Sequence, residues 1–276
     1  MNPRILLAIA KKDLLEVRQN KAAWLPMIIV PLVFIILFPL LILVLPQLSG
    51  QAAEQMINDP DMAMMFERLP GIIADKIAGM NPIQSIVVMM LGYFFAPMFL
   101  IFPLMFSTTV AAESFAGERE RKTMEALLYT PVSDTELFFG KMLAGLIPGI
   151  FISWASFLLY SVVLNAAGWP LFGELWFPLA TWYPLIFWVT PALAVMGVGL
   201  TVLISSKVQT FMGAYQASAS LVILVVGLML GQFAGVVYLN VGVGMLIGLL
   251  AWIIAGVMVF VSFQNFNRAK LLVSGS

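Results

Sequence analysis

The charged residues of this chain are concentrated in one polar segment, Glu113–Lys141, where their chemistry is electrostatic. Five consecutive charges lie within it: Glu118, Arg119, Glu120, Arg121 and Lys122. Only 10% of the 276 residues are charged, so this clustering indicates a specific role. Mixed charges fix the register and the choice of a protein partner more than its affinity. We therefore expect the segment to bind a soluble partner. The alternative is a solvated loop whose cations only set membrane orientation.

Several other kinds of chemistry are excluded by composition. The chain contains no cysteine and no histidine, which excludes thiol, disulfide and imidazole chemistry. Arg121-Lys122-Thr123 resembles the end of a P-loop, but Ala116 and Arg121 stand where that loop needs glycine. We therefore expect no catalytic residue, no metal site and no nucleotide bound by this chain. With a formal net charge of zero, nucleic acid is not an expected partner.

The chain is predicted to be an all-α integral membrane protein. Hydrophobic residues make up 62% of it and the mean hydropathy is +1.01, whereas soluble domains carry about 45–50% apolar residues. Because about 20 apolar residues span a bilayer, we predict six spans: Trp24–Leu45, Ile83–Ala111, Met142–Asn165, Leu179–Ile204, Phe211–Phe233 and Val241–Phe263. Only residues 234–240 separate the last two spans, so a broken or re-entrant arrangement is an alternative there. None of the spans has an ionisable side chain near its middle, which disfavours proton-coupled transport.

The distribution of lysine and arginine predicts the orientation. Six spans place both termini on one side, together with the second and fourth loops. That side carries Arg4, Lys11, Lys12, Arg18, Lys21, Arg119, Arg121, Lys122, Lys141, Lys207, Arg268 and Lys270. The opposite side carries Arg68 and Lys76. Since positive charge accumulates in cytoplasmic loops, we expect a multi-pass protein of the cell membrane with both termini in the cytoplasm.

Residues 5–22 are predicted to form an amphipathic helix along the inner face of the membrane. Its apolar side carries Leu6, Ala10, Leu14 and Val17, and its polar side carries Lys12, Asp13, Glu16 and Asn20. On the outer side, residues 46–82 are predicted to form two short amphipathic pieces. The aromatic residues of the second outer loop, Trp169, Trp176 and Phe177, with Trp182 nearby, are expected to anchor the membrane interface, or alternatively to stack on a substrate.

The polar segment is predicted to fold as a helical elbow. Gly117 is expected to break the helix of the second span, and Glu118–Tyr129 to form a short surface helix. The apolar side of that helix carries Met124, Leu127 and Leu128. Pro131 disfavours helix at the residue before it. Ser133 and Glu136 have the spacing of a capping box, which begins the third span.

The run GERERKTMEALLYTPVSDTELFFGK resembles the first cytoplasmic loop of type-2 ABC exporter permeases, and is most similar to the group with bacterial sodium-extrusion and multidrug permeases. The topology is similar throughout. The resemblance implies an efflux permease that works as a homodimer or pseudo-dimer with two separate ABC ATPase subunits, which bind ATP and Mg. The first outer segment and the connection between spans five and six are small for this group, so a sodium ion, a drug, a lipid and a peptide all stay open as substrates.

The resemblance also implies residue roles and domains. The domains are a cytoplasmic helix, 1–23, and a permease domain, 24–276, with outer loop 46–82, coupling loop 112–141 and cytoplasmic tail 264–276. The coupling helix would dock into the ATPase through Glu118, Arg119, Glu120, Arg121, Lys122, Thr123 and Glu125. The N-terminal helix would add a second contact through Lys11, Lys12 and Glu16.

Neutral polar residues and glycines occur within the spans. The candidate transport-path residues are Ser107, Thr108, Ser156, Tyr215 and Gln216. Hydrogen bonding between helices is the alternative role for them. Gly227, Gly231 and Gly235 form a ridge in the fifth span, and Gly244 and Gly248 form another in the sixth. Such ridges allow close helix approach. The resemblance implies a dimer contact between the first and fifth spans; packing within one subunit is the alternative.

Two other functions stay open at this point. A self-sufficient carrier or channel would work without nucleotide and without a partner. A membrane assembly or scaffold protein would use the polar segment for docking and transport nothing.

Overall fold

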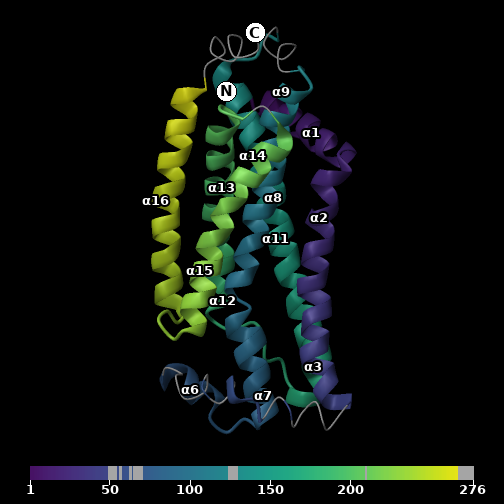
Figure 1. The fold of residues 1–276 in the computed structure, drawn as a ribbon, viewed down its shortest axis with the longest axis vertical. Helices are drawn as coiled ribbons and strands as arrows, with labels where there is room; N and C mark the ends of the chain where they lie inside the picture. The colour runs from purple at the N-terminus through teal and green to yellow at the C-terminus, as the bar shows by residue number, and fades with distance from the viewer. Residues whose placement is uncertain are drawn as a thin grey trace.

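The computed structural model describes residues 1–48, 55, 58–61, 64, 71–123, 130–208 and 210–266. Regular structure in these ranges is helical, and six helices are long and apolar enough to cross a membrane. They are Lys21–Leu48, Pro82–Glu120, Asp134–Phe172, Trp182–Ser205, Phe211–Phe233 and Val241–Asn265. These helices, numbered here as spans one to six, run along the long axis of the molecule (Figure 1). The predicted six-span all-α fold is confirmed.

Several spans are composites of shorter helical elements. Span one comprises α2 (Lys21–Leu32), η1 (Val33–Leu37) and α3 (Phe38–Leu48). Span two comprises six elements: α7 (Pro82–Val87), η2 (Val88–Phe94), η3 (Pro97–Leu100), α8 (Ile101–Ala112), η4 (Glu113–Gly117) and α9 (Glu118–Glu120). Span three is the single helix α11 (Asp134–Phe172). Span four comprises α12 (Trp182–Pro184), η5 (Leu185–Val189) and α13 (Thr190–Ser205); span five comprises α14 (Phe211–Ser218), η6 (Ala219–Leu221) and α15 (Val222–Phe233). Span six is α16 (Val241–Asn265). Spans five and six are therefore two full helices, and the broken arrangement is not observed.

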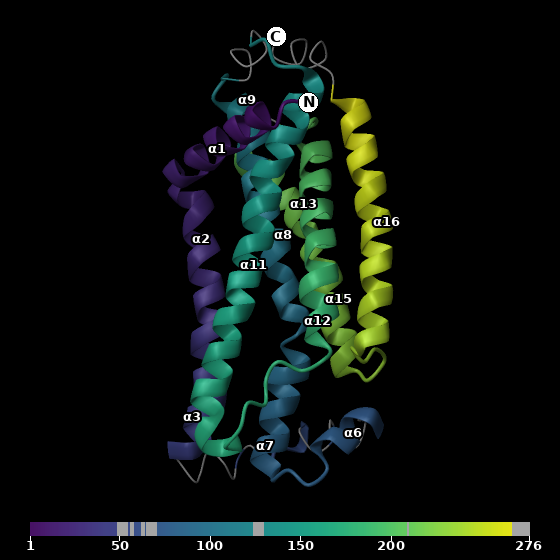
Figure 2. The ribbon, with the colours of Figure 1, turned by 180° about the vertical axis from the view of Figure 1, so that it is seen from behind.

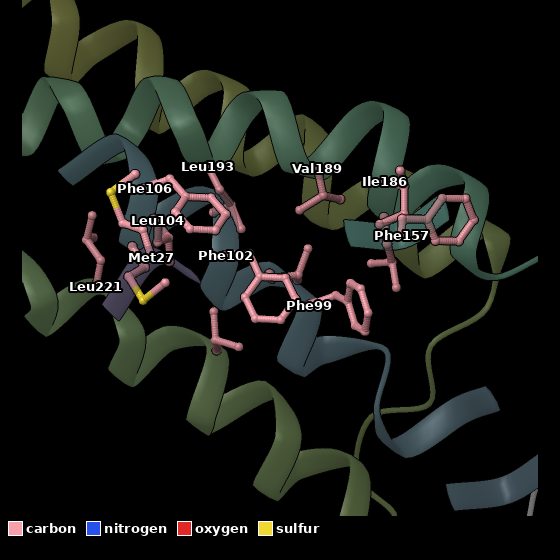
Figure 3. Packing of buried hydrophobic residues seen from close by; sticks show 14 of the residues in the cluster. Met27, Phe99, Phe102, Leu104, Phe106, Phe157, Ile186, Val189, Leu193 and Leu221 are labelled. Atoms are coloured by element: carbon pink, nitrogen blue, oxygen red, sulfur yellow. The ribbon is translucent and has the colours of Figure 1, made fainter. Parts of the chain in front are cut away.

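Spans two and four form the centre of the bundle. Within their most apolar stretches 78% and 72% of the residues are buried, against 22% in each of spans one, five and six. Figure 3 shows part of the core, in which Phe99, Phe102 and Phe106 of span two lie beside Val189 and Leu193 of span four. Spans one and six lie at opposite edges of the molecule in both ribbon views (Figures 1 and 2). The outward faces of the peripheral spans are apolar, as a surface in contact with lipid or another chain must be.

Span two is irregular around Pro97, which cannot donate a hydrogen bond to the preceding turn. Three consecutive carbonyls there, at residues 91–93, accept hydrogen bonds from side chains of three other spans. The donors are Tyr160 Oη to Leu91 at 2.8 Å, Trp182 Nε1 to Gly92 at 2.6 Å and Gln232 Nε2 to Tyr93 at 3.1 Å. Such bonds are required because a bilayer offers no water to backbone groups.

The prediction of interface anchors is wrong for two of the aromatic residues, Trp182 and Phe177, and Phe177 is only 3% exposed and packs on Tyr160 and Trp182. Trp182 was expected near the membrane interface, but it is fully buried among Phe99, Phe157 and Tyr160. Its N–H has its acceptor in span two, inside the protein. Trp169, by contrast, is 54% exposed, consistent with a position at the surface.

Two helices lie outside the bundle. The helix α1 (Pro3–Gln19) crosses one end of it, and α6 (Gly71–Ile77) lies at the opposite end, near α7 (Figure 1). Ile73 and Ile77 of α6 pack on Val88 and Tyr93 of span two. The helix α6 therefore corresponds to the second of the two short amphipathic segments predicted within residues 46–82. Most of the first segment lies outside the described residues.

Candidate functional site

Gly117 does not break the helix of span two, contrary to the prediction. Its dihedral angles are helical, with φ −63° and ψ −40°, and the helix continues through η4 into α9. A Cβ atom at this position would lie 3.1 Å from the carboxylate of Glu113. Glycine inside a helix costs only about 1 kcal/mol, and here it makes room for a buried acidic side chain. The charged run is therefore the end of span two rather than a separate surface helix.

The helix ends at Lys122, which has a left-handed backbone with φ 57°. The N–H of Thr123 donates to the carbonyl of Glu118 at 2.9 Å, and that of Lys122 to Arg119 at 3.0 Å. This pair of bonds is a Schellman motif, a common helix end. The predicted helix over Glu118–Tyr129 is thus wrong at this turn. Residues 124–129, including Glu125, Met124, Leu127 and Leu128, lie outside the described residues.

The predicted capping box at the start of span three is confirmed. Ser133 Oγ accepts a hydrogen bond from the N–H of Glu136 at 3.2 Å, and the Glu136 carboxylate accepts one from the N–H of Ser133 at 3.3 Å. The helix α11 therefore begins at Asp134, more than a turn before Lys141. This start directs the lysine into the protein.

A buried ion cluster joins α1, span two and span three. Lys141 and Glu118 are both fully buried, and Lys141 Nζ lies 2.6 Å from Glu118 Oε2. The same ammonium lies 3.3 Å from Asp13 Oδ2 and donates to the carbonyl of Ser114 at 2.7 Å. Ser114 Oγ donates to Asp13 as well. Because a buried charge without a partner is costly, these groups depend on one another to stay in place.

Lys12 occupies the position that a metal ion would take in this cluster. Carboxylate oxygens of Asp13, Glu16 and Glu118 lie close enough together to hold a cation. The ammonium of Lys12 contacts all three, at 3.3 Å from Asp13, at 3.0 Å from Glu16, and in a short contact with Glu118. Burial opposes the charge of Lys12, but the hydrogen bond and the charge of Glu118 outweigh burial and raise its pKa. Lys12 is therefore charged at neutral pH and, with Lys141 and Arg121, balances the charge of the three carboxylates.

The position of Asp13 corrects the predicted orientation of α1. Asp13 was placed on the polar, outward side of the helix, but it is only 1% exposed. Ala10 and Val17 are buried as predicted. Leu7 and Leu15, by contrast, are 58% and 49% exposed. The helix thus turns a polar face toward the bundle as well as an apolar one, because the partners of its charges are buried in spans two and three.

Arg121 links span two to α1, close to the junction between α1 and span one. It contacts Glu113 and lies 3.3 Å from Glu16. Asn20, which caps α2 by accepting from the N–H of Ala22, donates to Glu113 at 2.9 Å. The pKa of Arg121 is raised, because the hydrogen bond and charge of Glu113 and the charge of Glu16 outweigh partial burial. The carboxylate of Glu113 is thus held from two sides.

The two residues between Glu118 and Arg121 connect spans four and five to the end of span two. Arg119 donates to the carbonyl of Ser205 at the end of span four, at 2.6 Å. Glu120 accepts from the N–H of Phe211, the first residue of span five, at 2.8 Å. Four consecutive side chains therefore bind α1 and spans three, four and five to the end of span two. We call these side chains and their partners the ionic hub: Lys12, Asp13, Glu16, Glu113, Glu118, Arg119, Glu120, Arg121 and Lys141. Both ribbon views place α1 and α9 at the same end of the bundle (Figures 1 and 2).

The predicted partner-binding residues divide into two groups by exposure. Glu118 is buried, and Arg119, Lys12 and Glu16 are partly buried. The exposed members are Lys11, Glu120, Arg121, Lys122 and Thr123. Sequence reasoning missed Asp13, Glu113 and Lys141 as members of the site. The signal for Lys141 was its place in an apolar run, but its partner Asp13 lies 128 residues away.

The structure brings together two of the five predicted path residues. Thr108 and Tyr215 line a cavity of about 200 Å³ between α8 and span five, together with Ser218. Ser107 is buried against Gly197 of span four, and Ser156 is buried in span three. Gln216 is exposed on the outside of span five. The remaining lining of the cavity is apolar: Ile101, Leu104, Met105, Ala219 and Val222.

The two glycine ridges differ in their surroundings. A Cβ atom at Gly227 would have no heavy atom within 4 Å, and at Gly231 only Val237 would approach, at 3.5 Å. Gly235 has φ 75° and serves the turn after α15. Gly244 and Gly248 instead pack on Pro184 and Trp188 of span four. Among the described residues, therefore, the ridge of span six is used within the subunit and Gly227 faces open space.

Comparison with known proteins adds one finding. A family model described as ABC-2 family transporter protein matches residues 7–273, a range that includes every residue of the ionic hub. No curated protein and no solved structure matches the chain significantly.

Proposed function

Because the chain belongs to the ABC-2 family of transporter proteins, we propose that it is the permease subunit of an ATP-driven exporter and that ATP hydrolysis takes place on a separate ATPase subunit. Membership makes it a membrane permease component of an ABC transporter. ATP and Mg would be held by the ATPase partner. The hub end of the bundle would face the cytoplasm of a cell membrane, as the lysine and arginine distribution favours.

The ionic hub is the observation that supports coupling to a partner. Its consecutive residues Glu118–Arg121 bond to α1 and to spans three, four and five. A buried network whose charges are paired is rigid, so a force on the exposed turn would move these elements together. The exposed residues would contact the ATPase, and the buried pairs would pass its motion to the spans. Lys11 and Lys122 are the best candidates for direct contact, since both are exposed.

The cavity between spans two and five supports a lipophilic substrate. Its lining is mainly apolar, with the hydroxyl-bearing residues Thr108, Tyr215 and Ser218 and no carboxylate among the described lining residues. A hard cation such as sodium needs a shell of oxygen ligands. Of the substrate classes left open by the sequence, a drug or a lipid therefore fits this lining better than a sodium ion. We therefore propose that the chain belongs with the multidrug permeases rather than with the sodium-extrusion permeases.

The exposed ridge of span five supports a second permease copy. Gly227 lies on a face that also exposes Ile223 and Leu230, at 70% and 59%. Small residues beside large apolar ones allow close approach between helices in a membrane. We therefore propose a homodimer in which span five contributes to the contact.

The first experiment is purification of the chain from its native membrane, followed by mass analysis of what accompanies it. A stoichiometric ATPase subunit supports the proposal; a chain that purifies alone as a stable oligomer would favour a carrier or channel. The complex is then reconstituted in vesicles, and ATP-dependent export is compared for a lipophilic fluorescent dye and for sodium. Lys122→Glu should weaken ATPase binding, whereas Lys207→Glu, an exposed lysine after span four, serves as its control.

A further inference from the structure

A second cavity lies at the end of the bundle opposite the hub. It measures about 280 Å³ and forms where α6, span two, the segment before α12 and the start of α16 meet. Figure 1 shows α6 at this end of the molecule. The polar groups that line it come from the side chains of Lys76, Tyr93, Thr181, Tyr238 and Asn240 and from the backbone of Val241 and Gly242. Its position at the end of the spans is the depth at which lipid headgroups lie.

The N-terminus of a long helix opens into this cavity. The helix α16 has 25 residues and begins after its N-cap residue, Asn240. The side-chain oxygen of Asn240 accepts a hydrogen bond from the N–H of Val243 at 2.9 Å. Its backbone carbonyl accepts one from the N–H of Gly244 at 2.9 Å. The N–H groups of Val241 and Gly242 have no acceptor among the described residues. Free N–H groups at the positive end of a helix dipole attract anions.

A buried hydroxyl points independently to a missing ligand. Thr181 is only 6% exposed, lines the cavity, and its Oγ1 has no hydrogen-bond partner in the described part of the chain. A buried polar group left without a partner destabilises the folded protein. Because Oγ1 itself has almost no accessible surface, the Thr181 side chain must rotate to another staggered rotamer to meet a ligand oxygen in the cavity.

Lys76 supplies positive charge at the same place. It lies in the last turn of α6 and forms no ion pair within the described ranges. Ile73, Ala180 and Leu239 give the wall an apolar part, beside the polar side chains of Tyr238 and Asn240. The cavity thus combines an ammonium, two backbone N–H groups and a hydroxyl with an apolar surface.

We propose that this cavity binds the phosphate of an anionic phospholipid headgroup. The donors match a phosphate group, which offers several acceptor oxygens, and the apolar wall matches the attached glycerol and acyl chains. A free phosphate ion shares the headgroup's acceptor chemistry but would leave the apolar wall unused. The site does not depend on the proposed transport function.

The site is tested by lipid binding to the purified full chain in detergent, followed by native mass spectrometry. The probes are phosphatidylglycerol, diacylglycerol and inorganic phosphate. Val241→Pro removes one N–H while keeping the helix, since proline is favoured at the first helical position and the extended Asn240 (φ −128°, ψ 176°) suits a following proline. Val241→Ala keeps the N–H and is the matched control. Lys76→Gln and Thr181→Val test the other donors, and Lys207→Gln at the hub end controls for loss of positive charge.

The expected result is that phosphatidylglycerol binds and diacylglycerol does not. Val241→Pro should weaken phosphatidylglycerol binding about threefold relative to Val241→Ala, as the strength of a helix-terminus contact implies, and Lys76→Gln should weaken it more. Unfolding temperatures must stay within error of the wild type. If millimolar inorganic phosphate displaces the lipid, the anion site stands but its ligand is a soluble oxyanion, which overturns the lipid assignment. Equal binding by wild type, Val241→Pro and Lys76→Gln would overturn the site itself.

Discussion

Lys141 and Glu118 form an ion pair, 2.6 Å between Nζ and Oε2, in which both side chains are fully buried. The pair joins span three to the end of span two, where the chain leaves the bundle. Taking two charges out of water is costly, and only good geometry with further hydrogen bonds offsets that cost. Asp13, Ser114 and Lys12 supply those bonds. A network of this kind is therefore expected to hold α1 and two spans in one arrangement.

Replacing Lys141 with methionine should strongly destabilise the protein. The change leaves the buried carboxylates of Asp13 and Glu118 with less compensation, and breaking one side of a buried pair costs about 3–5 kcal/mol. Thermal unfolding in detergent measures the effect. Lys11→Met, at an exposed position of α1, should change stability little. An unfolding temperature for Lys141→Met equal to that of Lys11→Met would show that the pair contributes no stability.

A disulfide between α1 and span three should leave transport intact. A Cβ atom at Gly140 would lie 2.9 Å from Cβ of Ile9, and a disulfide needs about 3.8 Å, so a small shift suffices. The chain has no cysteine of its own, so Ile9→Cys with Gly140→Cys gives one defined bond. If the hub moves as one body, oxidised protein should export substrate at the rate of each single-cysteine control. Loss of ATP-dependent export on oxidation, with recovery in reductant, would show instead that α1 moves against span three.

The contribution of Lys12 to stability should be constant from pH 7 to about 10. Its pKa is raised in the folded protein, and an unfolded lysine titrates near 10.4. A raised pKa gives stability that is fully present below the unfolded value and is lost as pH rises through the folded value. The difference in unfolding temperature between the wild type and Lys12→Met should therefore be flat over this range and decrease only above it. A decrease between pH 7 and 9 would contradict the ion contacts of Lys12.

The six spans and the start of span three were predictable because their signals are local. Span length follows from runs of apolar residues, and Ser133 with Glu136 forms a cap within one turn. For the ionic hub, the sequence predicted a cluster of charged residues but not the contacts that they make. The charges of Glu118–Arg121 were visible, but their partners Lys12, Ser205 and Phe211 lie far away in sequence. Asp13 was misplaced because helical periodicity cannot distinguish a face toward water from a face toward a buried lysine. Gly117 was misread because its use, room for Glu113, depends on packing.

Filling the cavity between spans two and five should slow export of a lipophilic substrate. Ala219 lines this cavity beside Thr108 and Tyr215, so Ala219→Leu places three more carbon atoms in it. Dye export by reconstituted complex is expected to decrease several-fold without loss of the bound ATPase. Ala166→Leu, the same change at an exposed position of span three, is the control and should export normally. Unchanged export by Ala219→Leu would exclude this cavity from the path.

A large residue at Gly227 should prevent dimer formation without unfolding the subunit. A Cβ atom there meets nothing within 4 Å in the single chain, so Gly227→Leu adds no clash within the subunit, whereas a partner helix packed on the ridge could no longer approach closely. The mass of the particle in detergent, by light scattering, should decrease from two copies to one, with the unfolding temperature preserved. Gly248→Leu should instead lower the stability of the subunit itself, because a side chain there would overlap Trp188 of span four. The loss of stability should be the same in the monomer and in the dimer. Dimers of normal mass in Gly227→Leu would place the contact on another face of the protein.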